Sequence, residues 1–190
     1  MPLTTYTAGD VLTAASLNSN LKVAGGLQIV KAQTTFTAAS SVTVDNVFTS
    51  SYTNYRIQIK YQTSTTGDLN MRVRVGGVSA SGTNYNWQRI RGDSTTASAA
   101  RNASTSWEIA LASNGAFNST TIIDIFSPQL AEPTLVTWTN NYNVAAYTTP
   151  KWNAAGGNHD LSTAYDGFEL LPSSGTATGT YTVYGYNNTL

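Results

Sequence analysis

The sequence predicts an all-β protein: an antiparallel β-sandwich or jelly-roll knob of eight to ten strands, with a short helical arm at the N-terminus. Two stretches, Tyr55–Tyr61 and Leu69–Val75, alternate apolar and polar residues, which is the period of a half-buried strand. Charged residues make up only 11% of the chain, and Lys and Glu, which favour helix surfaces, are scarce. Thr, Tyr and Asn are frequent, so strands with neutral polar surfaces are expected.

The N-terminal segment, residues 1–26, is predicted to be a docking arm. Thr13 is a candidate N-cap for a short helix with one apolar side. Two helical turns are not stable alone in water, so this side must pack either on the chain's own domain or on a partner subunit or platform. Gly25–Gly26 is then a hinge before the knob, residues 27–190. The predicted docking residues are Leu12, Leu17 and Leu21.

Within the knob, we expect the two alternating stretches to pair as an antiparallel hairpin, because the connection Gln62–Asp68 is rich in Thr and Ser and contains Gly67. The outer face of this hairpin, either solvated or in contact with an anion or glycan, carries Arg56, Lys60, Arg72 and Arg74. Clusters of Gly, Asn, Pro and Ser separate the further strand candidates Val42–Phe48, Tyr85–Ile90, Trp107–Leu111, Thr121–Phe126, Thr134–Tyr142, Phe168–Leu171 and Gly179–Tyr186.

Two stretches interrupt the alternation, Gly92–Ser106 and Asn143–Thr163. Both are rich in Ala, Ser, Thr, Asn or Gly, and we expect them to be exposed loops. Loops of this length in a compact domain commonly carry function or form interfaces.

Composition excludes several classes of function. Ten basic residues balance ten acidic ones, so the field that attracts nucleic acid or an anionic membrane is missing. No cysteine is available for disulfides, thiolate metal sites or nucleophiles. The N-terminus lacks the pattern of a signal peptide, and no apolar run approaches the length that spans a bilayer. We expect a soluble protein made in the cytosol.

No catalytic grouping is predicted, and therefore no enzyme, cofactor or metal. His159 is the single histidine and is expected to be a polar loop residue, because a zinc site or a Ser-His-Asp triad would need partners that the sequence does not supply. A glycosidase needs two paired carboxylates, and nothing in the sequence pairs Glu108, Asp124, Glu132, Asp166 or Glu169.

Aromatic residues are the remaining chemically useful set, because a flat ring stacks on the apolar face of a sugar. Trp87, Trp107 and Trp138 fall within strand patterns and are expected in the core or at a subunit interface. The Gly-rich second loop supplies the candidates for glycan contact, Tyr147, Trp152 and Asn153.

Four segments resemble the surface proteins of tailed-bacteriophage virions, a group of tail fibres, head fibres and capsid decorations. The C-terminal segment Tyr165–Asn187 is similar to an ending of the form D-G-F-x-L-x-P-S-S-G…V-Y-G-Y-N. Ala8–Asn18 resembles the G-x-x-L-T-A-x-x-L-N segment that opens many of these proteins. Val47–Tyr55 and Phe126–Thr134 resemble recurring phrases of the same group.

This resemblance implies a virion protein, usually a homotrimer, that is attached through its arm to other proteins of the tail, baseplate or capsid. Host surface glycan is a further candidate partner of the exposed knob, on the strength of the aromatic residues above. The resemblance transfers no catalytic residue and leaves the position in the particle open. The alternative is a lectin-like carbohydrate-binding receptor module without a primary structural role, because fold alone does not fix function.

Overall fold

The computed structural model describes residues 7–9, 11, 13, 26–93, 95–113, 117–143 and 150–187. The predicted arm helix with Leu12, Leu17 and Leu21 therefore lies outside the described residues, as does Tyr147. Gly26, the second residue of the predicted hinge, is described and begins the first strand.

The described residues form thirteen strands in two antiparallel sheets, which confirms the all-β sandwich but exceeds the predicted eight to ten strands. The larger sheet has eight strands in the order β1-β13-β3-β9-β10-β11-β6-β7, and the smaller has β2-β12-β4-β5 with β8 paired to β4. The strands are β1 (Gly26–Ala39), β2 (Val42–Val44), β3 (Asn54–Thr63), β4 (Gly67–Val75), β5 (Val78–Ser79), β6 (Tyr85–Asp93), β7 (Thr96–Ser104), β8 (Trp107–Ser113), β9 (Ser119–Phe126), β10 (Thr134–Tyr142), β11 (Lys151–His159), β12 (Gly167–Pro172) and β13 (Ala177–Asn187).

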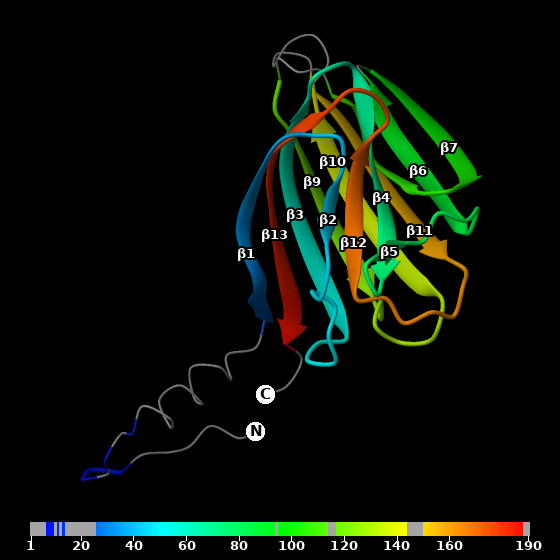
Figure 1. The fold of residues 1–190 in the computed structure, drawn as a ribbon. Coiled ribbons are helices and arrows are strands. Elements are labelled where there is room, and N and C mark those ends of the chain that lie inside the picture. Colours follow the sequence, from blue (N-terminus) through cyan, green and yellow to red (C-terminus); the bar gives the residue numbers. More distant parts are fainter. Residues whose placement is uncertain are drawn as a thin grey trace.

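The core lies between the inner faces of the two sheets. Figure 1 shows β2, β12, β4 and β5 in front of the larger sheet, with β1 and β7 at its two edges. Strand β10 buries every second residue from Thr134 to Tyr142, which is the side-chain period of a strand. The larger sheet contributes Tyr55, Ile57, Ile123 and Val136 to the core, and the smaller contributes Leu69, Met71, Val73 and Phe168.

The predicted hairpin of Tyr55–Tyr61 with Leu69–Val75 is wrong. Strand β3 pairs with β13 and β9 in the larger sheet, whereas β4 pairs with β12, β5 and β8 in the smaller one. Both strands bury one apolar face, and they do so in opposite layers of the sandwich instead of side by side. Alternation identifies the buried face of a strand but not its neighbour, so the pattern was compatible with either arrangement.

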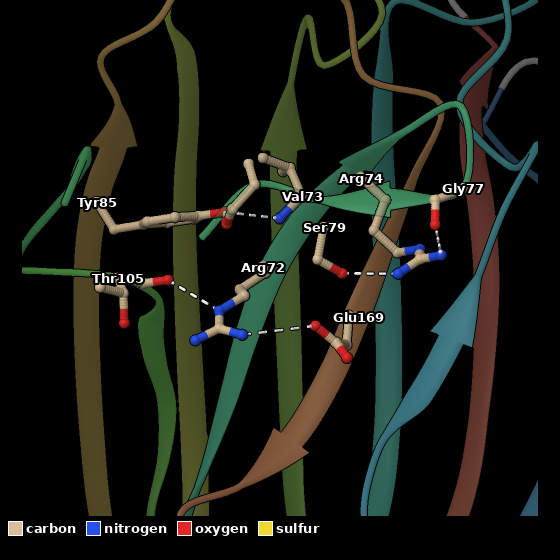
Figure 2. A network of polar contacts seen from close by, with 9 residues as sticks. Arg72, Val73, Arg74, Gly77, Ser79, Tyr85, Thr105 and Glu169 are labelled. Carbon is tan, nitrogen blue, oxygen red and sulfur yellow. Dashed lines mark hydrogen bonds and ion pairs between the residues drawn. The ribbon is translucent and has the colours of Figure 1, made fainter. Parts of the chain in front are cut away.

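The four basic residues predicted to share one outer face are consequently divided between the two sheets. On the smaller sheet, Arg72 donates a 3.0 Å hydrogen bond to the carbonyl of Thr105 and lies 3.9 Å from Glu169 (Figure 2). Arg74, which is buried, pairs with Asp45 at 2.7 Å. These arginines are therefore held by structural contacts and offer little free charge to an external anion.

The two predicted loops also contain strands. The segment 92–106 holds the end of β6 and all of β7, and the segment 143–163 holds β11. The eight residues from Thr96 to Ala103 are all exposed, so β7 needs no apolar alternation. In β11 a side chain at Gly157 would place Cβ 2.3 Å from the carbonyl oxygen of Asn86, so the strand needs glycine for close approach to β6.

Candidate functional site

The larger sheet has an outer face, formed by the side chains that point away from the smaller sheet. Strand register places outer-face residues in rows that run across the strands. One row crosses six neighbouring strands, from β3 to β7, through Arg56, Asp124, Thr137, Gly156, Gln88 and Arg101. The next row contains Gln58, Ile122, Thr139, Ala154, Ile90 and Ala99.

A hollow of about 620 Å³ on this face lies over β11, β6 and β7. Gly156 has no side chain, so the sheet surface is low at this point. Amide side chains surround the low point, together with one guanidinium. This hollow is called the amide groove below, and its outer-face residues are Asn86, Gln88, Arg101, Ala103, Gly156 and Asn158.

Smaller hollows continue across the same face. One of about 340 Å³ is bordered by Thr137 and Ala154, and one of about 360 Å³ is bordered by Gln58 and Thr120. A third, of about 250 Å³, includes Gln62. Their outer-face side chains are mostly neutral hydrogen-bonding groups, so the face presents a polar surface to an extended ligand.

Trp152 is on the same face and the same strand as the amide groove. Its side chain is 48% exposed, and it lies four residues before Gly156 along β11. At a rise of about 3.3 Å per residue the two positions are about 13 Å apart. Ile90 and Ala154 occupy the row between them. An exposed indole, a short apolar row and a polar hollow thus follow one another along the strand.

An ion pair lies at the centre of the face. Arg56 contacts both carboxylate oxygens of Asp124 at 2.8 and 2.7 Å, and the hydroxyl of Tyr186 donates to Asp124 at 2.6 Å. The guanidinium also lies over the ring of Tyr186, 5.7 Å from its centroid. Burial alone raises the pKa of Asp124, but the hydrogen bonds from Arg56 and Tyr186 outweigh burial, so its pKa lies below the usual value. The carboxylate is therefore ionised at neutral pH and already paired.

Of the three predicted glycan contacts, only Trp152 lies on this face. Asn153 is the next residue on the strand, so it points into the sandwich; it is fully buried and donates a 3.3 Å hydrogen bond to the side-chain oxygen of Asn140. Its prediction as a glycan contact is wrong, because it rested on a loop where the chain forms a strand. Tyr147 lies outside the described residues.

The other three tryptophans are buried, which confirms their prediction as core residues. His159 is also buried, at the end of β11, and is not the polar loop residue that the sequence predicted. The imidazole packs edge-on against Tyr85 at 4.4 Å between centroids, and its Nδ1 lies 3.0 Å from the hydroxyl of Tyr165. Burial lowers the pKa of His159, and the opposing effect of Asp160 is smaller, so the neutral form is favoured.

Ionisable groups show no arrangement that suggests chemistry within the described part of the chain. No three His, Cys, Asp or Glu residues gather there as metal ligands would. Glu108, Asp124 and Glu169 are each paired with an arginine. No helix among the described residues is long and apolar enough to cross a membrane.

Sequence reasoning missed the residues of the amide groove, although one signal for them was present. Asn86 and Gln88 flank Trp87 in an alternating strand, so a buried tryptophan implies that both amides face outward. Gly156 and Asn158 could not be added, because their segment was taken as a loop. Arg101 was missed for the same reason.

Comparison with known proteins gives no family assignment. No family model matches the chain. No curated protein matches it either. Among solved structures, one similar chain is the catalytic domain of PdAgaC, 8% identical over 85% of this chain and 74% of that chain, with a TM-score of 0.21. A likeness this low carries no inference about function.

Proposed function

We propose that the protein is a non-enzymatic knob on the surface of a tailed-phage virion, attached through its N-terminal arm and contacting host glycans on the outer face of its larger sheet. The observation that carries the glycan contact is the succession of Trp152, Ile90 and the amide groove along one exposed face with few charged side chains. Amide groups donate to and accept from sugar hydroxyls, and an indole stacks on the apolar face of the ring.

The virion role is supported by the resemblance of the C-terminal segment. Tyr165–Asn187 contains β12 of the smaller sheet and β13 of the larger one, so it connects the two layers of the sandwich. Similarity in this segment therefore concerns a part of the chain that determines the fold. The trimeric state and the virion location rest on the same resemblance, and the docking platform rests on that of Ala8–Asn18.

The docking arm is tested by the double substitution Leu17→Asp and Leu21→Asp. Charged side chains on the apolar side of the arm should prevent burial against the platform, so we expect the chain to be absent from particles assembled in its presence while the knob stays folded. Immunogold labelling of purified particles measures incorporation, and circular dichroism checks the fold. Normal incorporation of the double variant would contradict docking through this arm.

A lectin-like receptor module without a structural role is the second candidate, and the amide groove and Trp152 favour it equally. The two functions differ in what the knob needs for binding. A receptor module binds a glycan array when residues 1–26 are removed and is not found in particles. A virion knob is found in particles through its arm, whether or not its glycan is on the array.

Glycan contact is tested by Trp152→Ala and Gln88→Ala. Loss of a stacking ring or of an amide partner should cost about 1.4 kcal/mol, which is a tenfold loss of affinity. A glycan array of neutral oligosaccharides first identifies a ligand, and titration calorimetry with that oligosaccharide measures the loss.

The matched control is Gln58→Ala, which removes the same amide from the same face three strands away from β11. Its affinity should be unchanged. A further variant, Gly156→Val, fills the groove; its Cβ would meet the carbonyl oxygen of Val136 at 3.6 Å, an ordinary contact, so the fold should tolerate it. Binding that survives Gly156→Val but falls with Gln58→Ala would place the ligand elsewhere on the face.

A further inference from the structure

Strand β7 is exposed in a way that an isolated domain does not explain. It forms one edge of the larger sheet, and its residues from Thr96 to Ala103 are exposed on both faces. The smaller sheet, with five strands against eight, does not cover it. The strand therefore adds no buried apolar surface, yet it pairs with β6 through nine consecutive residues.

The edge carries few of the features by which β-proteins protect edge strands from pairing. The register of β7 with β6 has no shift, and the strand Thr96–Ser104 contains no proline and one charged residue, Arg101. The opposite edge differs: β1 pairs with β13 through three register shifts, which bend and twist a strand, and it carries Lys31. One edge of the sheet is thus protected and the other is open.

We infer that β7 is an interaction surface, and that its partner is the β7 strand of a second copy of this chain, in antiparallel orientation. Every second residue of an edge strand directs its backbone N–H and C=O away from the sheet, and a strand is the partner that satisfies all of them. The two larger sheets then join into one continuous sheet across a two-fold axis.

Self-pairing fits the sequence of the strand. With Ala100 opposite Ala100 of the second copy, Ala99 faces Arg101 and Ser98 faces Asn102. Every facing pair is small or uncharged on at least one side, so no clash and no directly opposed like charges arise. The two Arg101 side chains lie on the diagonal, about 7–8 Å apart, where salt screens their repulsion.

This pairing has a consequence for the proposed glycan contact, although it does not depend on it. Arg101 and Ala103 line the amide groove and lie within three residues of the symmetry axis. The alternation of side chains keeps the outer faces of both copies on the same side of the joined sheet, because residues paired across strands point the same way. Two grooves would then lie next to each other, an arrangement that favours divalent binding.

The test uses position 100, where Ala100 of one copy would lie opposite Ala100 of the other. Ala100→Glu and Ala100→Lys each place two like charges directly opposite one another, so each variant alone should associate at least tenfold more weakly than the unmodified chain. An equal mixture of the two variants places glutamate opposite lysine and should recover the association. Sedimentation equilibrium of the full chain over a range of concentrations measures the mass in all four samples.

We expect the unmodified chain to have twice the mass of either variant, whether the smaller species is a monomer or a trimer. Thr35→Glu, an exposed charge on the protected edge strand β1, is the matched control and should leave the mass unchanged. Circular dichroism should be the same for all variants, because position 100 is exposed. The inference is overturned if the unmodified chain has the mass of the variants, or if the mixture fails to recover association, since β7 would then have a different partner or none.

Discussion

Replacing Asn140 by leucine is expected to lower the free energy of unfolding by about 3 kcal/mol, despite the larger apolar side chain. The buried amide donates to the carbonyl of Thr120 at 2.9 Å and to the hydroxyl of Thr121 at 3.0 Å. Its oxygen accepts from the N–H of Leu111 at 3.2 Å and from Asn153 at 3.3 Å. Because β8 belongs to the smaller sheet, the bond to Leu111 joins the two layers. Leucine would leave several buried polar groups without partners.

Urea denaturation of the two proteins measures this loss. The neighbouring substitution Asn141→Leu is the matched control, because Asn141 follows on the same strand but is exposed on the outer face, where the change should stay within about 0.5 kcal/mol. A loss below about 1 kcal/mol for Asn140→Leu would show that the amide's contacts are replaced by water or by rearranged neighbours.

Strand alternation predicted the all-β class and most strands of the core, but it could not predict which strands are neighbours. Tyr55–Tyr61 and Leu69–Val75 have the strongest alternation in the chain, and the structure places them in different sheets. The information needed lies in pairings far apart in sequence. Strand β3, for example, pairs with β13 near the C-terminus. A hydrophobic pattern within one segment does not record such pairings.

The candidate site was predicted only in part, for a related reason. Trp152 was correctly taken as exposed because tryptophan in a Gly-rich, polar segment has few apolar neighbours to bury it. Asn153 was predicted as a glycan contact together with Trp152. Consecutive residues of a strand face opposite sides, however, so only one of the two can lie on the outer face. The amide groove combines residues from β6, β7 and β11, and only the register between these strands brings them together.

Truncation of Trp107 to alanine is expected to have the largest effect of any single substitution proposed, a loss of about 4 kcal/mol in the free energy of unfolding. The indole is fully buried and packs edge-on against Tyr85 at 5.0 Å and against His159 at 6.4 Å between centroids. It belongs to β8 of the smaller sheet, whereas both partners belong to the larger one, so its removal opens a cavity between the layers. Chemical denaturation measures the loss. Trp152→Ala is the control, because this tryptophan is half-exposed, and it should lower the free energy of unfolding by less than about 1 kcal/mol.

Trp107→Phe separates packing from the polar contact that this indole makes. The indole N–H donates a 3.3 Å hydrogen bond to the carbonyl of Asn158, whose side chain lines the amide groove on the opposite face of the sheet. Phenylalanine keeps most of the buried ring but leaves that carbonyl without the donor, so a loss of about 1–2 kcal/mol in stability is expected. If glycan affinity falls together with stability, the core positions Asn158 for the groove. If affinity is retained, the ladder between β11 and β6 is sufficient to hold Asn158, and the groove is a property of the larger sheet alone.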